Sequence, residues 1–111
     1  MNKSLYAQYI FEREEIETVE SENYFFTYKI IENEFHVLDM FVREEFRCSL
    51  LVKEMMDLID QMALDSGSKY LVSSVIAGLP NSEKSASLQF RYGMKFLKCD
   101  GNKIILIKEI K

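Results

Sequence analysis

The sequence predicts an α/β (α+β) fold: a mixed, mainly antiparallel sheet with one long and one short helix. In the first 42 residues, runs rich in aromatic and aliphatic residues alternate with short polar gaps, and such gaps join antiparallel strands because parallel strands need longer crossovers. The spacing of apolar residues then changes to three and four, which is typical of a helix, before further strands follow. With 111 residues, the chain is long enough for one core, so we expect a single domain over residues 1–111.

The N-terminal part is predicted to be an antiparallel meander. Its strands are rich in residues that favour extended structure, and the segments between them contain Glu, Ser and Asn, which suit turns. The four predicted strands are Leu5–Phe11, Ile16–Val19, Tyr24–Ile31 and Phe35–Val42.

The long helix is predicted over Leu50–Asp65. A stripe of apolar side chains recurs at three- and four-residue spacing and is expected to pack in the core: Leu51, Met55, Leu58 and Met62, with their neighbours Met56, Ile59 and Ala63. Gly67 follows directly and is suited to a left-handed residue at the helix end.

A strand over Lys69–Ala77 comes after this helix. A strand–helix–strand order requires a crossover, so Lys69–Ala77 is expected to run parallel to Phe35–Val42, and no other pair of strands is expected to be parallel. The short helix is predicted to begin at Asn81 or Ser82, either of which could cap it, and to stop at Gly93.

The C-terminus is predicted to form a hairpin of strands Met94–Lys98 and Lys103–Ile110. The turn is placed around Asp100 and Gly101, because this dipeptide tolerates the positive φ angles of tight hairpin turns.

Composition excludes several classes of function. A net charge of −4 argues against general nucleic-acid binding, which needs an excess of Lys and Arg. No apolar run reaches the roughly 18 residues of a membrane span, and no signal peptide is visible, so a cytoplasmic location is expected. One His and two Cys do not provide a four-ligand zinc site without carboxylates, so no metal is expected.

Three segments resemble the GNAT (general N-acetyltransferase) superfamily, and especially its short phage and bacterial members. Phe35–Arg47 is similar to the family's central strand and its V-x-P-e-y-R continuation. Gly67–Val75 is similar to the strand after the long helix, and Tyr92–Phe96 with the closing strand Ile104–Ile110 is similar to the Y-G-F ending. The resemblance implies a GNAT fold and an acetyl-CoA site.

In the family, an R/Q-x-x-G-x-G/A loop leads into the long helix and lets backbone N–H groups approach the CoA pyrophosphate. Here Leu50 and Val52 occupy the two glycine positions, so the loop is degenerate, acetyl-CoA binding is expected to be weak or absent, and glycine at both positions should raise it. The alternatives are a weakened anion site at Arg47 and Ser49, or an ordinary strand-to-helix corner. The candidate cofactor-binding residues are Val42, Arg47, Cys48, Ser49, Leu50, Leu51, Val52 and Asn81.

The resemblance also implies where catalytic residues belong. A general base on the central strand falls at His36 or Asp39, whose side chains are expected on opposite faces of the strand. The family's leaving-group tyrosine lies four residues before the glycine, where this chain has Gln89, and Tyr92 is adjacent to Gly93.

Two functions remain open. The first is a GNAT-fold protein that has lost acetyltransferase activity and acts as a binding or assembly module, for example a phage structural or virion-associated protein. The second is an active N-acetyltransferase that moves an acetyl group from acetyl-CoA to an amine. Because a strand at Leu5 leaves no room for the family's N-terminal helices, we expect a protein partner or a second copy to cover the groove beside the central strand.

Overall fold

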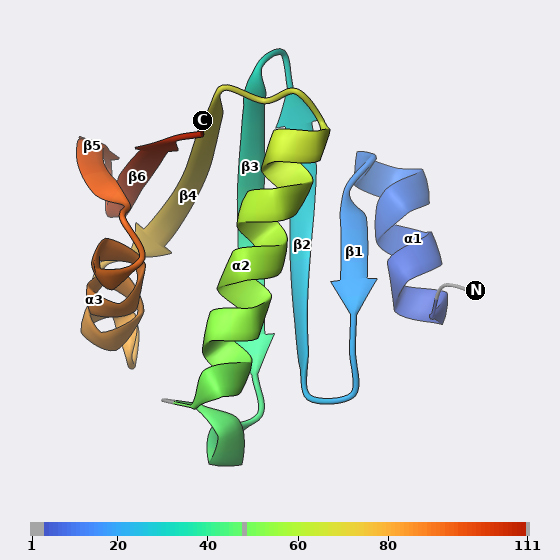
Figure 1. Cartoon of the computed structure of the whole chain (residues 1–111), viewed down its shortest axis with the longest axis horizontal. Coiled ribbons are helices and arrows are strands. Elements are labelled where there is room, and N and C mark those ends of the chain that lie inside the picture. Colours follow the sequence, from blue (N-terminus) through green and yellow to red (C-terminus); the bar gives the residue numbers. More distant parts are fainter. Residues whose placement is uncertain (1–3, 48, 111) are drawn as a thin grey trace.

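The chain is described by a computed structural model that covers residues 4–47 and 49–110, so Cys48 lies outside the described residues. The described residues form three α-helices and a six-stranded sheet (Figure 1). In chain order the elements are α1 (Leu5–Glu14), β1 (Glu17–Glu20), β2 (Tyr24–Ile31), β3 (Glu34–Val42), a 3-10 turn (Glu44–Phe46), α2 (Leu50–Asp65), β4 (Tyr70–Ile76), α3 (Ser82–Arg91), β5 (Lys95–Asp100) and β6 (Lys103–Glu109).

The sheet has the strand order β1-β2-β3-β4-β6-β5. β3 and β4 run parallel and are connected by α2, and the other neighbouring strands are antiparallel. This confirms the predicted fold class and the predicted parallel pair. None of the helices in the described part of the chain is long and apolar enough to cross a membrane.

The prediction of a strand over Leu5–Phe11 is wrong, because these residues lie in α1. The Ser4 side chain accepts a hydrogen bond from the Ala7 N–H at 3.1 Å, which caps the helix start. At the other end Glu15 has a left-handed φ of 57° and its N–H donates to the Phe11 carbonyl. The chain therefore has a third helix, and it lies beside β1 at the edge of the sheet (Figure 1).

The core lies between α2 and the sheet face that α2 covers. α2 begins where predicted, at Leu50, and Gly67 follows its end with the expected left-handed φ of 78°. The buried residues of α2 recur at helical spacing and pack against alternate residues of the strands. They are Val52, Met55, Met56, Ile59 and Ala63.

The closing hairpin forms as predicted, but its turn is one residue later than expected. Asp100 is the last residue of β5 and pairs with Lys103, so the two turn residues are Gly101 and Asn102. Gly101 has a φ of 64°, whereas neither Asp100 nor Asn102 has a positive φ, so a single glycine supplies the conformation that the turn requires.

A β-bulge interrupts β3 at Leu38. Thr27 of β2 pairs with Asp39 and Tyr28 pairs with Val37, so Leu38 is an extra residue without a partner in this ladder. Because successive strand residues point to opposite faces, the extra residue reverses the alternation in the second half of β3. Val37 and Met40, three positions apart, therefore both point towards α2.

Burial affects the ionisation of Tyr28, whose ring stacks on Phe35 with 4.6 Å between centroids. Burial, and secondly the Glu17 carboxylate, raise the pKa of Tyr28 above its ordinary value of 10.0. A raised pKa in the folded state means that this contribution to stability is complete below about pH 10 and is lost as the pH rises further. Tyr28→Phe should therefore lose less unfolding free energy than the unmodified protein between about pH 9 and pH 11, measured by urea unfolding.

The control for this prediction is Tyr6→Phe in α1, because the Tyr6 side chain is exposed. It should show the same alkaline loss of stability as the unmodified protein. An identical pH dependence for Tyr28→Phe and Tyr6→Phe would contradict the assignment.

Candidate functional site

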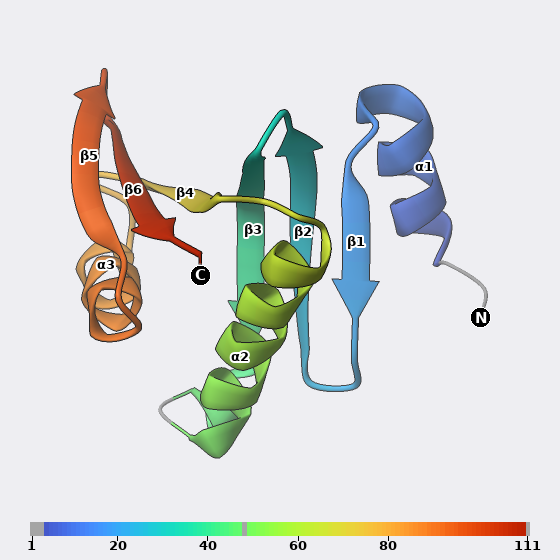
Figure 2. The same ribbon diagram turned by 45° about the horizontal axis from the view of Figure 1, so that its top comes forward.

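The candidate site lies where β3 and β4 separate. The two strands pair only over Glu34–Val37 and Tyr70–Ser73. Beyond these residues β3 stays hydrogen-bonded to β2, and β4 stays hydrogen-bonded to β6. We call this divergence after Val37 and Ser73 the fork; Figures 1 and 2 show β4 turning away from β3, with α2 starting near the end of β3.

Ser49 caps the start of α2. Its side chain accepts a hydrogen bond from the Leu51 N–H at 3.2 Å, and its carbonyl accepts one from the Val52 N–H at 3.1 Å. The Ser49 hydroxyl in turn donates to the Phe46 carbonyl. The N–H groups with which a helix start could bind an anion are therefore partly used within the chain itself.

Arg47 lies just before this cap. Its Nε donates to the Val42 carbonyl at 2.8 Å, and its guanidinium carbon lies 5.2 Å from the centroid of the Phe41 ring. These two contacts hold the guanidinium beside the end of β3. The remaining guanidinium N–H groups are the most suitable donors for a phosphate in this region.

The two side chains at the family's glycine positions have different surroundings. Leu50, the first residue of α2, is 83% exposed, whereas Val52 is 4% exposed and belongs to the core. The expectation that Val52 crowds the approach of a pyrophosphate is therefore wrong, because its side chain points into the protein. Of these two side chains, Leu50 is the one that extends into solvent.

Gln89, at the family's tyrosine position, is buried, and both the oxygen and the nitrogen of its side-chain amide are hydrogen-bonded. Its Oε1 accepts a hydrogen bond from the hydroxyl of Ser73 in β4, and its Nε2 donates to the hydroxyl of Ser85 at 3.3 Å. The sequence did not indicate these partners, because the contact with Ser73 joins two elements 16 residues apart. Gln89 thus attaches α3 to the strand at the fork.

Little space remains beside Gln89. The cavity there has a volume of about 10 Å³, which is room for roughly one water molecule. Side chains from α2, α3, β3 and β4, and from the segment between α3 and β5, line it: Val37, Met40, Met56, Ile59, Leu71, Ser73, Gln89 and Met94. On the helix-covered face, the fork is therefore filled by the protein's own side chains.

The prediction that His36 and Asp39 point to opposite faces is wrong. His36 pairs with Lys29 and Asp39 pairs with Thr27, and two residues that are two apart in β2 share a face. The bulge at Leu38 is the reason, because in a strand without a bulge two residues that are three positions apart point to opposite faces of the sheet. Both candidate bases therefore lie on the sheet face opposite α2.

The two candidate bases differ in their contacts. His36 Nε2 lies 2.8 Å from Glu34 Oε1, and the two side chains are 24% and 39% exposed. Asp39 is exposed, and it lies beyond the last residue of β3 that pairs with β4. The structure thus places Asp39 beside the fork and His36 within the paired region, where it is linked to Glu34.

Asn81 precedes α3 as its cap residue but makes no side-chain capping bond. Its backbone has a left-handed φ of 67°, and its carbonyl accepts a hydrogen bond from the Ser85 N–H at 3.0 Å. Asn tolerates this conformation better than most residues do. The short helix therefore begins where predicted, at Ser82, through backbone geometry at Asn81.

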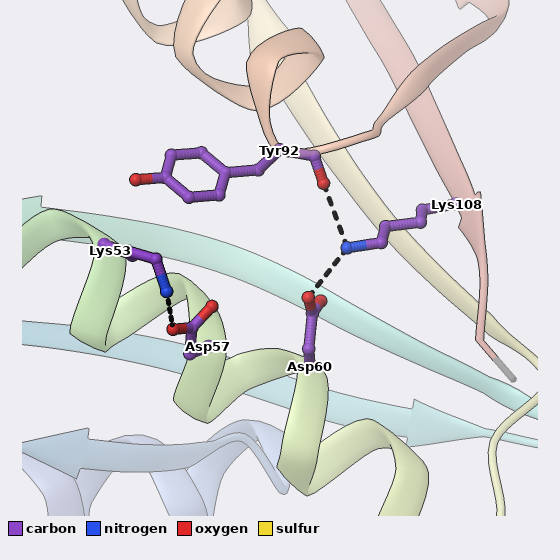
Figure 3. A network of polar contacts seen from close by, with 5 residues as sticks. All are labelled: Lys53, Asp57, Asp60, Tyr92 and Lys108. Atoms are coloured by element: carbon purple, nitrogen blue, oxygen red, sulfur yellow. Dashed lines mark hydrogen bonds and ion pairs between the residues drawn. The ribbon is translucent and has the colours of Figure 1, made fainter.

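A polar network joins the end of α3 to α2 and β6 (Figure 3). Lys108 Nζ donates to Asp60 Oδ2 at 2.7 Å and to the Tyr92 carbonyl at 2.9 Å. In α2, Lys53 Nζ donates to Asp57 Oδ2 at 2.6 Å, and this bond raises the pKa of Lys53 above its ordinary value. The bond from Lys108 holds the Tyr92 carbonyl at the C-terminal end of α3, which is the end opposite Asn81. This contact of Tyr92 stabilises the fold.

A cavity of about 380 Å³ lies near this network, between the C-terminal half of α2 and the end of β6. Its lining combines charged with uncharged side chains, and it lies at the opposite end of α2 from Ser49: Asp57, Asp60, Gln61, Leu64, Lys108, Glu109 and Ile110. Within residues 4–47 and 49–110, no group of three or more His, Cys, Asp or Glu is arranged to hold a metal ion.

The different positions of Leu50 and Val52 predict different costs of substitution. Val52→Gly removes a buried side chain and adds a helix-breaking residue, so it should lower the unfolding free energy by about 2–4 kcal/mol. Leu50→Gly, at an exposed first helical position, should cost less than about 1 kcal/mol. Urea unfolding of both variants measures this difference, and equal losses would contradict the placement of Val52.

The comparison with known proteins gives matches among solved structures but none among family models or curated sequences. Among solved structures, a GNAT family acetyltransferase from Elizabethkingia anophelis with acetyl-CoA bound has a TM-score of 0.73 and 14% identity, and the match covers 97% of this chain and 83% of that one. The IAA acetyltransferase from Bacillus cereus has a TM-score of 0.70 and 12% identity over 85% of this chain and 77% of that one.

The PaiA N-acetyltransferase from Thermoplasma acidophilum, solved in complex with coenzyme A, has a TM-score of 0.71 and 20% identity. The match covers 78% of this chain and spans 53% of the length of the Thermoplasma protein. The chain has the fold of the GNAT acetyltransferases.

Proposed function

We propose that this chain is a GNAT-fold binding module that does not transfer acetyl groups. The observation that carries the proposal is the filled fork. Gln89 stands where the family has its leaving-group tyrosine, and both ends of its amide are bonded within the protein, to Ser73 and Ser85. An amide held in this way has no ionisable proton to give to a departing thiolate.

The start of α2 supports the same proposal. Ser49 accepts bonds from the Leu51 and Val52 N–H groups, and Leu50 extends into solvent at the position of the first family glycine. An incoming pyrophosphate would have to displace the Ser49 cap and pass the Leu50 side chain. We therefore propose that acetyl-CoA binds weakly, with Arg47 as the main contact for a phosphate.

An active N-acetyltransferase is the second candidate function, and one observation favours it. The bulge at Leu38 places Asp39 and His36 on one face, and Asp39 is exposed beside the fork. A carboxylate in that position could accept a proton from an amine. A role in a phage particle stays a prediction.

Titration with acetyl-CoA distinguishes these proposals. We expect no saturable heat for the unmodified chain up to about 1 mM ligand. Leu50→Gly combined with Gln89→Ala should give measurable binding, because the two changes uncover the helix start and enlarge the fork. Leu64→Gly combined with Gln89→Ala is the matched control, since Leu64 is also an exposed leucine of α2, at its other end.

A dissociation constant well below about 1 mM for the unmodified chain would overturn weak binding. Thiol release from acetyl-CoA in the presence of a panel of primary amines tests the second candidate. Release above the uncatalysed rate that disappears in Asp39→Asn would establish an enzyme. A rate that equals the background with every amine supports the binding module.

A further inference from the structure

The outer edge of the sheet at β5 has no partner strand in the described part of the chain. β5 pairs only with β6 and is the last strand in the sheet order, which Figure 2 shows at one side of the molecule. All six residues of β5 are exposed, including Phe96 at 57% and Leu97 at 47%. An edge strand of this kind presents backbone N–H and C=O groups that can pair with another strand.

A second β-bulge determines which residues of β5 share a face. Phe96 pairs with Leu106 and Lys98 pairs with Ile105, so Leu97 is an extra residue. Beyond the bulge Asp100 pairs with Lys103, and before it Lys95 pairs with Ile107. Since Lys103 and Ile107 are four apart in a regular strand, Lys95 and Asp100 point to the same face.

Because of this bulge, two copies of β5 can pair side by side and antiparallel, with the first residue of one strand opposite the last residue of the other. Two copies of one strand that pair antiparallel are related by a two-fold axis perpendicular to the sheet, so opposed residues must point to the same face. In an unbroken strand of six residues, the first and last residues point to opposite faces. With Leu97 inserted, Lys95 can oppose Asp100, and Phe96 can oppose Cys99, which pairs with Ile104 on the face of Leu106.

We infer that two copies of this chain associate through β5 in an antiparallel, two-fold symmetric pair. Lys95 of each copy then lies opposite Asp100 of the partner subunit, which gives two ion pairs in one interface. Neither Lys95 nor Asp100 has an ion-pair partner among the residues that the structure describes. Phe96 then packs against Cys99 of the partner subunit, on the other face.

The charged residues of β5 also favour a second copy of this chain as the partner of its free edge. Lysines on an edge strand discourage pairing with an arbitrary neutral strand, whereas the second copy supplies a carboxylate at the matching position. The opposite edge of the sheet does not fit. Its acidic residues Glu17 and Glu20 pair with Tyr28 and Phe25, so they point to opposite faces and cannot both meet Lys95 and Lys98.

Because the strand is short, the interface belongs to the small, transient class, below roughly 1,200 Å² in total. We therefore expect the association to be weak. The prediction is therefore a monomer–dimer equilibrium that depends on concentration.

Disulfide trapping tests the register. In a Cys48→Ser background, Phe96→Cys should form a cross-linked dimer with the natural Cys99 under mild oxidation, because directly opposed residues have Cα atoms within about 4.4–6.8 Å. The readout is a band of twice the monomer mass on a non-reducing gel. Lys95→Cys in the same background is the matched control, since position 95 points to the face opposite Cys99 and should not cross-link.

Absence of a cross-link in folded Phe96→Cys, or equal cross-linking in the Lys95→Cys control, would overturn the proposal. Circular dichroism establishes whether each variant is folded. If Phe96→Cys unfolds the hairpin, sedimentation equilibrium of Lys95→Asp decides in its place. The dissociation constant of the Lys95→Asp dimer should be at least 10-fold higher than that of the unmodified chain. An equimolar mixture of Lys95→Asp and Asp100→Lys should form the dimer again. The inference is overturned if Lys95→Asp leaves the dissociation constant unchanged, or if the mixture does not restore the dimer.

Discussion

The short parallel contact between β3 and β4 is the constraint on which the rest of this structure depends. Only four residue pairs join the antiparallel group β1-β2-β3 to the group β4-β6-β5. The divergence beyond Val37 and Ser73 would leave apolar side chains uncovered on both strands. On one face, α2 contacts both β3 and β4, and α3 packs on β4, so α2 joins the two groups of strands.

The same constraint explains the role of Gln89. A polar side chain in a buried position must have hydrogen-bond partners, because leaving its amide unsatisfied costs about 1–3 kcal/mol. Ser73 and Ser85 supply these partners. The hydrogen bond with Ser73 joins α3 to β4 at the fork. In this chain the fork is stabilised by an internal polar contact.

The sequence predicted the elements whose signals are local. The apolar period over Leu50–Asp65 and the glycine after it located α2, and the need for a crossover identified the parallel pair. Leu5–Phe11 has the aromatic and aliphatic content of a strand, and the signal that favours a helix there is the single capping side chain of Ser4. The bulge at Leu38 has no signal in one sequence, since it depends on how β2 and β3 align, and so the shared face of His36 and Asp39 could not be predicted. The burial of Val52 was foreseeable from its place on the apolar stripe of α2.

The cap at Ser49 has a consequence for how the stability of the helix start depends on a ligand. A protein whose binding site has unsatisfied donors gains stability when its ligand is present, so its folded fraction rises and falls with ligand supply. Here the chain satisfies donors at the helix start with its own hydroxyl and carbonyl groups. The Leu51 and Val52 N–H groups therefore have acceptors without any bound anion, and their hydrogen bonds contribute to the stability of α2 at every ligand concentration.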